Sequence, residues 1–154
     1  MDIRPAREQD LPSILGLAAQ VELWFGPMVD DPGFQRSVNQ HILRSAALIA
    51  VAPNTEILGA VMFGVKAPTY RIHWLVVAEQ QRGNNVGSAL MTHATRRFTQ
   101  VPGIIEVVTF GIDHPGATAS GARAFYESLG FVPAEAAAPG PEGGSRQVYR
   151  KAIS

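Results

Sequence analysis

The segment from Leu75 to Leu90 constrains what this chain can fold into more than any other stretch. Its apolar start predicts a strand, its polar middle predicts a tight turn, and its end, from Val86 onward, predicts a helix. The first amides of a helix have no partner inside it and point outward along the helix dipole. Gly83 and Gly87 let a ligand come close to the backbone. The segment therefore predicts a cradle for a phosphate group at a strand-to-helix turn.

The expected cradle comprises the turn and the first helical residues, Arg82, Gly83, Asn84, Asn85, Val86, Gly87 and Ser88. Arg82 adds a positive charge beside it. A Walker phosphate loop would end in Gly-Lys-Ser/Thr, and a dinucleotide fingerprint would place three glycines at other spacings, so neither motif is present. Taken by itself, the turn is also compatible with a glycine-containing connection that binds nothing.

Apolar periodicity on either side of this segment predicts the remaining elements. Strands are expected at residues 3–5, 48–52, 57–66, 71–77, 104–110, 131–134 and 147–153, and helices at 11–21, 34–44, 86–99 and 120–129. Their order is β-α-α-β-β-β-α-β-α-β-β. We expect one α/β domain over residues 1–154, with a mixed, mostly antiparallel sheet of six or seven strands and helices on both faces.

Four finer expectations concern local structure and packing. Asp10 is a predicted N-cap, and residues 24–33, rich in glycine, proline and aspartate, predict a loop. The β-branched strand at 104–110 is expected to be buried on both faces. In the helix at 86–99 the spacing predicts one inward face, formed by Ala89, Leu90, His93 and Phe98.

Charge and composition argue against several classes of protein. Basic and acidic residues both number 13, so the formal net charge is zero, and we expect neither a nucleic-acid partner nor a membrane surface. The chain has no cysteine, which excludes disulfides, thiolate metal sites and a cysteine nucleophile; no metal is expected. The start of the chain, Met1 to Pro5, lacks the apolar core of a signal peptide, so the expected location is the cytoplasm.

Two segments together resemble the GCN5-related N-acetyltransferase (GNAT) family. Its acetyl-CoA motif is Gln/Arg-x-x-Gly-x-Gly/Ala after an apolar strand, and the match here is Arg82-Gly83-Asn84-Asn85-Val86-Gly87. The segment 122–131 is similar to the family's Ala-x-x-Phe-Tyr-Glu-x-Leu-Gly-Phe. Asn85 replaces the middle glycine of the first motif, although asparagine tolerates left-handed backbone angles. Ala119 stands where the family often has an asparagine.

The resemblance implies an acyl-CoA-dependent N-acetyltransferase that moves the acetyl group of acetyl-CoA directly onto a primary amine of a small molecule. It implies that the pantetheine arm pairs with the free backbone of Leu75, Val76 and Val77, where an amide also polarises the thioester carbonyl. Tyr126 is then the expected general acid for the leaving thiolate, unless it is only a core aromatic. The family also suggests a homodimer.

The base that deprotonates the acceptor is less well defined. Some family members use a glutamate at the position of Arg71, which cannot serve here. His73 is a candidate on the same strand face. Asp113 and His114 follow the strand 104–110 at its carboxyl end and are equal contenders, although Pro115 after them suits an ordinary turn. An ordered water is the remaining alternative.

Acceptor-binding residues are expected in the first helix–helix connection. Trp24 and Phe25 are large aromatics in a predicted loop, where they either face the acceptor or staple the loop to the sheet. Asp30 and Asp31 either attract a cationic amine or cap the next helix. Other acyl groups, a hydroxyl acceptor and a non-catalytic acyl-CoA sensor remain alternative functions.

Overall fold

One seven-stranded sheet organises the computed structural model, which describes all residues 1–154. The strands are β1 (Asp2–Pro5), β2 (Ala47–Val51), β3 (Ile57–Gly64), β4 (Thr69–Val77), β5 (Gly103–Phe110), β6 (Val132–Ala137) and β7 (Arg146–Ile153). Their order in the sheet is β1-β2-β3-β4-β5-β7-β6. Only β4 and β5 run parallel, and every other neighbouring pair is antiparallel. The expected mixed, mostly antiparallel sheet is therefore confirmed.

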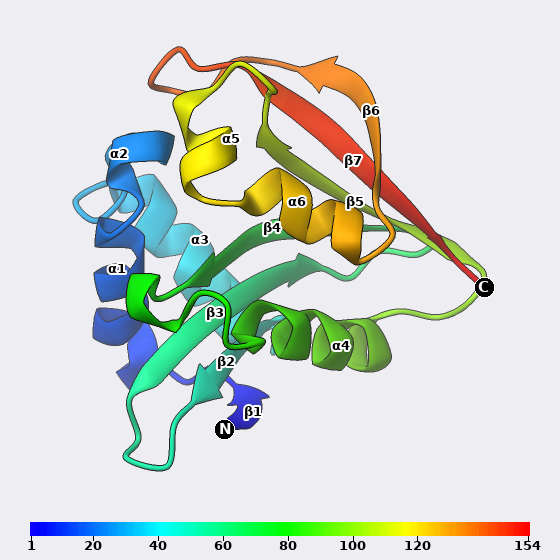
Figure 1. Ribbon diagram of the computed structural model, residues 1–154. Helices are drawn as coiled ribbons and strands as arrows, with labels where there is room; N and C mark the ends of the chain where they lie inside the picture. The colour runs from blue at the N-terminus through cyan, green and yellow to red at the C-terminus, as the bar shows by residue number, and fades with distance from the viewer.

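Helices cover both faces of this sheet (Figure 1). They are α1 (Leu11–Ala19), α2 (Glu22–Phe25), α3 (Pro32–Leu43), α4 (Val86–Phe98), α5 (Pro115–Ala119) and α6 (Ala122–Ser128), with 3-10 turns at Glu8–Asp10 and Glu79–Gln81. None of these helices has the length and apolar character that crossing a bilayer requires.

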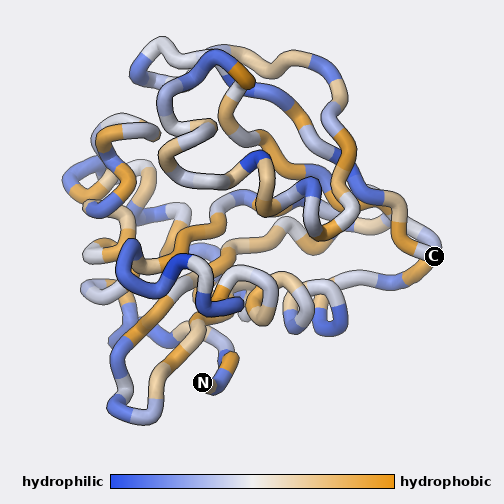
Figure 2. The backbone as a smooth tube through the Cα atoms, viewed as in Figure 1, coloured by the Kyte–Doolittle hydropathy of each residue, from blue (hydrophilic) through white to orange (hydrophobic).

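Two apolar cores lie on the two sides of the sheet. One packs α1 and α3 against β2, β3 and β4, through residues such as Ile14, Val38 and Ile49. The other packs α4 and α6 against β2 to β5 and β7, through Leu90, Phe63 and others. Figure 2 shows the hydrophobic residues concentrated along the strands between these helices. Burial of these side chains is the main favourable contribution to the fold.

Two short helices were not expected from the sequence. The helix α2 includes the first two residues of the connection at 24–33. The carboxylate of Glu22, its first residue, accepts hydrogen bonds from the amides of Met28 and Val29 at 2.5 and 3.0 Å and so holds the following turn against the helix. The second addition, α5, starts at Pro115, with the side chain of His114 accepting from the Gly116 amide.

The expected burial was wrong at two elements. In β5, Ile104 and Val108 are 39% and 45% exposed, because α1 and α3 pack against β2, β3 and β4 and leave this part of β5 uncovered. In α4 the buried face contains Met91 and Ala94, whereas His93 is exposed. Both errors depend on which distant elements pack against the residue, and local periodicity does not contain that information.

Asp10 ties the first strand to the first helix. Its buried carboxylate accepts hydrogen bonds from both Arg4 guanidinium nitrogens, at 2.9 and 3.1 Å, and from the Arg7 amide at 2.8 Å. Asp10 stands at the N-cap position of α1, but its side chain caps no α1 amide. The hydrogen bond from Arg4 is the main reason why the pKa of Asp10 lies below its ordinary value.

We expect Asp10→Ala to lower the free energy of unfolding by about 1–3 kcal/mol, because the Arg7 amide and the Arg4 guanidinium lose their partner. The pKa of Asp10 is lower in the folded chain, so this stabilisation is present above the unfolded-state pKa and disappears as the pH falls through the folded-state pKa. Urea unfolding at neutral and acid pH measures it. Equal stability of the two proteins at neutral pH would contradict this role.

The feature of the fold that matters most for a site is a gap between β4 and β5. Their parallel pairing runs from Thr69–Ile104 to Ile72–Val107 and then stops. Beyond Ile72, β4 continues for five residues beside β3 only. Figure 1 shows β5, β7 and β6 diverging from the rest of the sheet. One edge of β4 is therefore left without a strand partner.

Candidate functional site

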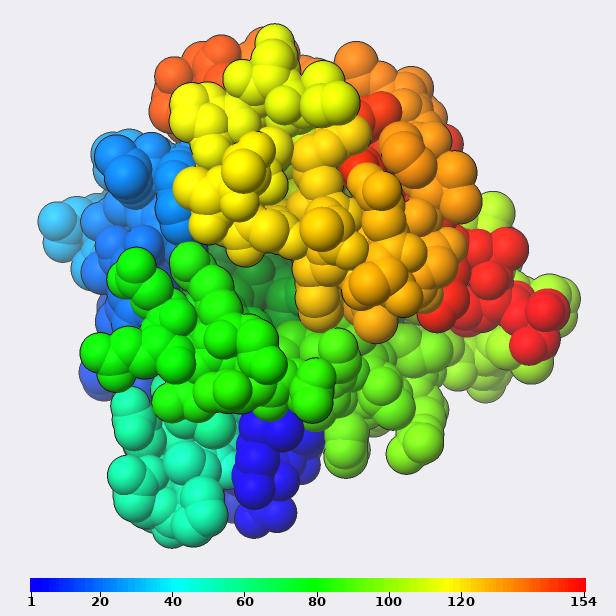
Figure 3. All heavy atoms as spheres, viewed as in Figure 1, coloured from blue at the N-terminus to red at the C-terminus, as the bar shows by residue number.

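A cavity of about 360 Å³ lies at this gap, between the end of β4, the N-terminus of α4, and helices α2 and α6. Figure 3 shows it as a hollow between the green segment at residues 80–90 and the yellow helices α5 and α6. Most of the residues that the sequence analysis selected line it: Trp24, Phe25, Leu75, Val76, Val77, Arg82, Gly83, Asn85, Val86, Gly87, Ser88 and Tyr126.

Free backbone amides form one end of this cavity. The N–H groups of five residues in the turn and the first turn of α4 donate to no acceptor in the chain: Gly83, Asn85, Val86, Gly87 and Ser88. A 13-residue helix adds the positive end of its dipole at the same point. Five unpaired donors beside a helix N-terminus match the oxygens of a phosphate or diphosphate group. The residues present therefore fit an anionic ligand.

The backbone of the turn has the shape that this cradle requires. Gly83 has φ +85°, and Asn85 has φ +64°, in the left-handed region. Asparagine thus occupies the conformation that a glycine would adopt more easily. Gly87 faces the ring of Phe125, and a Cβ at this position would lie only 3.0 Å from two of its carbons. Asn84 is exposed and points to Gln81 rather than into the cavity.

The unpaired edge of β4 forms the floor of the cavity. The amide of Ala78 donates to the carbonyl oxygen of Leu58 in β3. Because hydrogen-bonded pairs alternate along an antiparallel ladder, the backbone groups of Leu75 and Val77 then point away from β3, toward the gap. These groups are available to an extended ligand that lies between β4 and β5.

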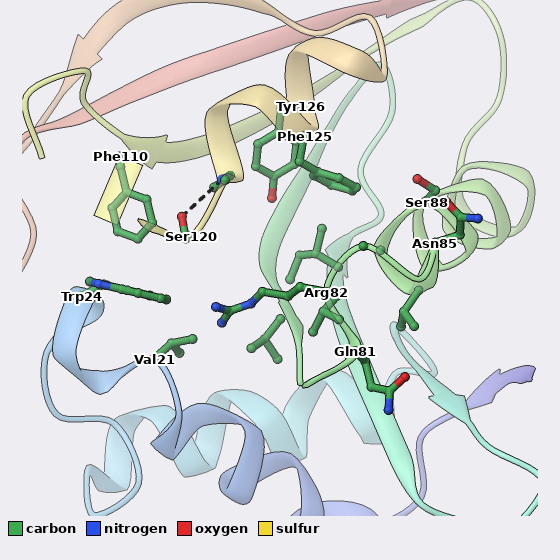
Figure 4. Close-up of a pocket in the computed structure, with 18 of the residues that line it drawn as sticks. Val21, Trp24, Gln81, Arg82, Asn85, Ser88, Phe110, Ser120, Phe125 and Tyr126 are labelled. Carbon is green, nitrogen blue, oxygen red and sulfur yellow. Dashed lines mark hydrogen bonds between the residues drawn. The ribbon is translucent and has the colours of Figure 1, made fainter. Parts of the chain in front are cut away.

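Tyr126 closes the cavity from the side of α6. Its ring packs against Phe125 and Phe131 at centroid distances of 5.2 and 5.5 Å. In Figure 4 its hydroxyl points into the cavity, and it makes no hydrogen bond within the chain. Burial raises the pKa of the Tyr126 phenol. The phenol is thus protonated at neutral pH and has a free donor.

Aromatic side chains form the wall opposite the amides. Trp24 and Phe25 in α2 contact Phe110 at the end of β5, with ring centroids 6.5 and 4.7 Å apart. The guanidinium of Arg82 lies 5.2 Å from the centre of the Trp24 ring. Figure 4 shows the Arg82 side chain extending toward Trp24. The cavity thus has an apolar wall with one cation against it.

Besides Asn84, five residues selected from the sequence do not line the cavity. His73 is bonded to His41 of α3, with 2.8 Å between ring nitrogens, and burial is the main reason why its pKa lies below the ordinary value. His114 accepts from the Gly116 amide and contacts Glu142 at 3.3 Å. Asp113, Asp30 and Asp31 also lie outside the cavity. Asp113 accepts from the Ser145 hydroxyl, and Asp30 is exposed.

Several residues that line the cavity were not predicted from the sequence. Phe110 ends β5 and Phe125 precedes Tyr126, and both contribute apolar surface. Gly121 and Ala122 stand at the N-terminus of α6, next to Ser120, whose hydroxyl accepts from the Ala122 amide at 3.2 Å. The position of Phe110, at the carboxyl end of a central strand, is a signal that could have identified it.

Comparison with known proteins supports this picture. A family model described as an acetyltransferase (GNAT) domain matches residues 44–133, which contain β3, β4, the turn, α4, β5 and α6. A search of curated sequences finds no match.

Many solved structures share the fold. A chain from Desulfovibrio desulfuricans, assigned to the acetyltransferases of the GNAT family, has a TM-score of 0.78 at 20% identity, with 99% of each chain covered. An aminoglycoside 6'-N-acetyltransferase complexed with coenzyme A has a TM-score of 0.74 at 18% identity, covering 100% of this chain and 98% of that one. PaiA N-acetyltransferase from Thermoplasma acidophilum, in complex with coenzyme A, has a TM-score of 0.75 at 16% identity, covering 99% and 98%.

Proposed function

The chain belongs to the GNAT acetyltransferase family, and from this premise we propose that it moves an acetyl group from acetyl-CoA to the primary amine of a small molecule. The observation that supports this most directly is the set of five unpaired amides at the start of α4, next to the open edge of β4. A diphosphate and an extended amide-bearing arm are the two chemical features of CoA that these surfaces suit.

In this proposal the turn, the edge of β4 and Tyr126 have separate roles. The amides of the turn hold the diphosphate, and the backbone of Leu75 and Val77 pairs with the pantetheine arm. A free amide on this edge polarises the acetyl carbonyl. The amine nitrogen bonds to the acetyl carbon, the C–S bond breaks, the nitrogen loses one proton, and the thiolate gains one. Tyr126 supplies the proton or hydrogen bond to the sulfur.

Calorimetry with CoA, followed by a thiol-release assay with acetyl-CoA and a panel of amines, tests this function. We expect binding in the micromolar range, as is usual for enzyme substrates, and release of one thiol for each acetylated amine, identified by mass spectrometry. No heat with millimolar CoA would refute the function. Binding without turnover on any amine would favour an acyl-CoA sensor.

The pH dependence distinguishes the possible bases. Apart from Arg82, Tyr126 is the only side chain with a titratable group among those that line the cavity. We therefore propose that the acceptor reacts as the free amine and loses its proton to water, so that kcat/KM rises with pH up to the pKa of the acceptor's own amine. Two acceptors with different amine pKa values should show the rise at two different pH values.

A histidine base would give a different result. The rise would then occur at the same pH for every acceptor, and for His73 at a pH below its ordinary pKa of about 6.5, since its pKa is lowered. His73→Ala and His114→Ala identify which one is responsible. A rise that does not move with the acceptor would overturn the proposal of solvent as the proton acceptor.

We further propose that residues 1–154 act as one domain in the cytoplasm. A homodimer is a proposal too, and light scattering of the purified chain tests it.

A further inference from the structure

Arg82 is the one charged side chain on the wall of the cavity, and it points toward the aromatic side of the cavity. The free amides of the phosphate cradle belong to Gly83 and to residues 85–88. The side chain of Arg82 instead reaches the ring of Trp24, 5.2 Å from its centre (Figure 4). The guanidinium therefore lies against the aromatic wall, on the side where an acceptor would enter.

This guanidinium has no anionic partner in the chain. It takes part in no ion pair or side-chain hydrogen bond, and contact with an aromatic face satisfies only part of its charge. Glu79 and Asp30, exposed acidic side chains of the neighbouring segments, form no ion pair with it, and three other acids are held by different partners. Glu22 accepts from the amides of Met28 and Val29, Asp31 accepts from the Gly33 amide, and Glu142 contacts His114. No carboxylate lines the cavity, so an acid on a bound ligand can pair with this guanidinium.

The wall around Arg82 is apolar. Trp24 and Phe25 each contact Phe110, and all three rings leave surface toward the cavity. A polycationic acceptor would meet a positive charge here and no carboxylate, which is unfavourable. An acceptor with a carboxylate and an apolar body matches both the cation and the rings, because guanidinium and carboxylate form paired, charge-assisted hydrogen bonds.

We propose that the acceptor is an amino carboxylate with an apolar or aromatic body, and that Arg82 determines this specificity by binding its carboxylate. This inference rests on the acetyl transfer proposed above and names the substrate class of the same site. The carboxylate and the body fix the acceptor so that its amine faces the gap between β4 and Tyr126. The amine, not the carboxylate, forms the new bond.

A set of matched acceptors tests this specificity. It contains amino carboxylates with aromatic or branched apolar bodies, each with its carboxamide and its decarboxylated amine. For each set we measure kcat/KM with the wild-type protein and with Arg82→Gln, and we measure CoA affinity by calorimetry. Comparing the ratio of carboxylate to carboxamide between the two proteins cancels differences in intrinsic amine reactivity.

We expect the wild-type preference for the carboxylate over the carboxamide to fall at least about tenfold in Arg82→Gln, as a lost charge-assisted hydrogen bond predicts. The CoA dissociation constant should change by less than about threefold. Arg97→Gln is the matched control, because Arg97 also lies over an aromatic ring, that of Phe98, but far from the cavity; it should retain the wild-type preference.

Three outcomes would overturn the inference. In the first, Arg82→Gln leaves both the preference and CoA binding unchanged. In the second, it weakens CoA binding more than tenfold and leaves the preference unchanged, which would assign Arg82 to the diphosphate. In the third, the wild-type protein binds CoA and acetylates only amines without a carboxylate, or none in the panel. Failure of the wild-type protein to bind CoA is a separate result, which refutes the proposed function itself.

Discussion

Gly87→Glu should abolish CoA binding, with an increase of at least about 100-fold in the dissociation constant. Gly87 is the second residue of α4, and its amide is one of the five free donors of the cradle. A carboxylate here would occupy the anion site and repel the diphosphate, and like charges that face each other cost several kcal/mol. Since 1.4 kcal/mol corresponds to a factor of ten in the dissociation constant, a cost of several kcal/mol implies at least two factors of ten. Isothermal calorimetry measures the change.

Steric effects also contribute at this position, because a Cβ on Gly87 would lie 3.0 Å from the ring of Phe125. Gly87→Gln separates them, since glutamine has the size of glutamate without the charge. We expect Gln to weaken CoA binding less than Glu does, at equal thermal stability. His93→Glu adds the same charge to an exposed position of α4 and should leave affinity near wild type. Wild-type affinity in Gly87→Glu would show that the diphosphate binds elsewhere.

The parts of the site that could be predicted from the sequence are those made by consecutive residues. The cradle depends on a strand, a turn and a helix within sixteen residues, and on the left-handed conformation that Asn85 tolerates, so the local pattern contains the necessary information. The sheet follows similarly from the alternation of apolar segments and turns. The open edge of β4 was expected from family resemblance rather than from local pattern.

Other parts depend on residues that are distant in the chain. His73 is a candidate base in the sequence, but in the structure its ring is hydrogen-bonded to His41 of α3 and does not line the cavity. The side chain of Arg82 is directed toward Trp24, which packs against the core on the α1 and α3 side of the sheet. Ile104 and Val108 are exposed because α1 and α3 pack against β2, β3 and β4 instead. Side-chain direction and one-sided burial are tertiary properties, which periodicity does not encode.

Tyr126→Phe should lower kcat by about 100-fold, at the lower end of the usual contribution of a positioned acid, and should change the CoA dissociation constant by less than about threefold. The ring contacts with Phe125 and Phe131 are retained in phenylalanine, so packing of α6 is preserved. Only the hydroxyl is lost, and this hydroxyl has no partner in the chain that would be left unsatisfied. The loss should therefore appear in the transition state, where the thiolate develops charge.

The raised pKa of Tyr126 gives this prediction a second, independent readout. A phenol whose pKa is raised by burial stays protonated throughout the range in which the acceptor amine titrates, so its removal should lower kcat by the same factor at every pH tested. Tyr70→Phe is the matched control, because the Tyr70 hydroxyl accepts from the Gln100 amide and does not line the cavity; it should affect stability and leave kcat unchanged. If Tyr126→Phe turns over as fast as the wild-type protein, Tyr126 is only part of the core, and the leaving thiolate takes its proton from water.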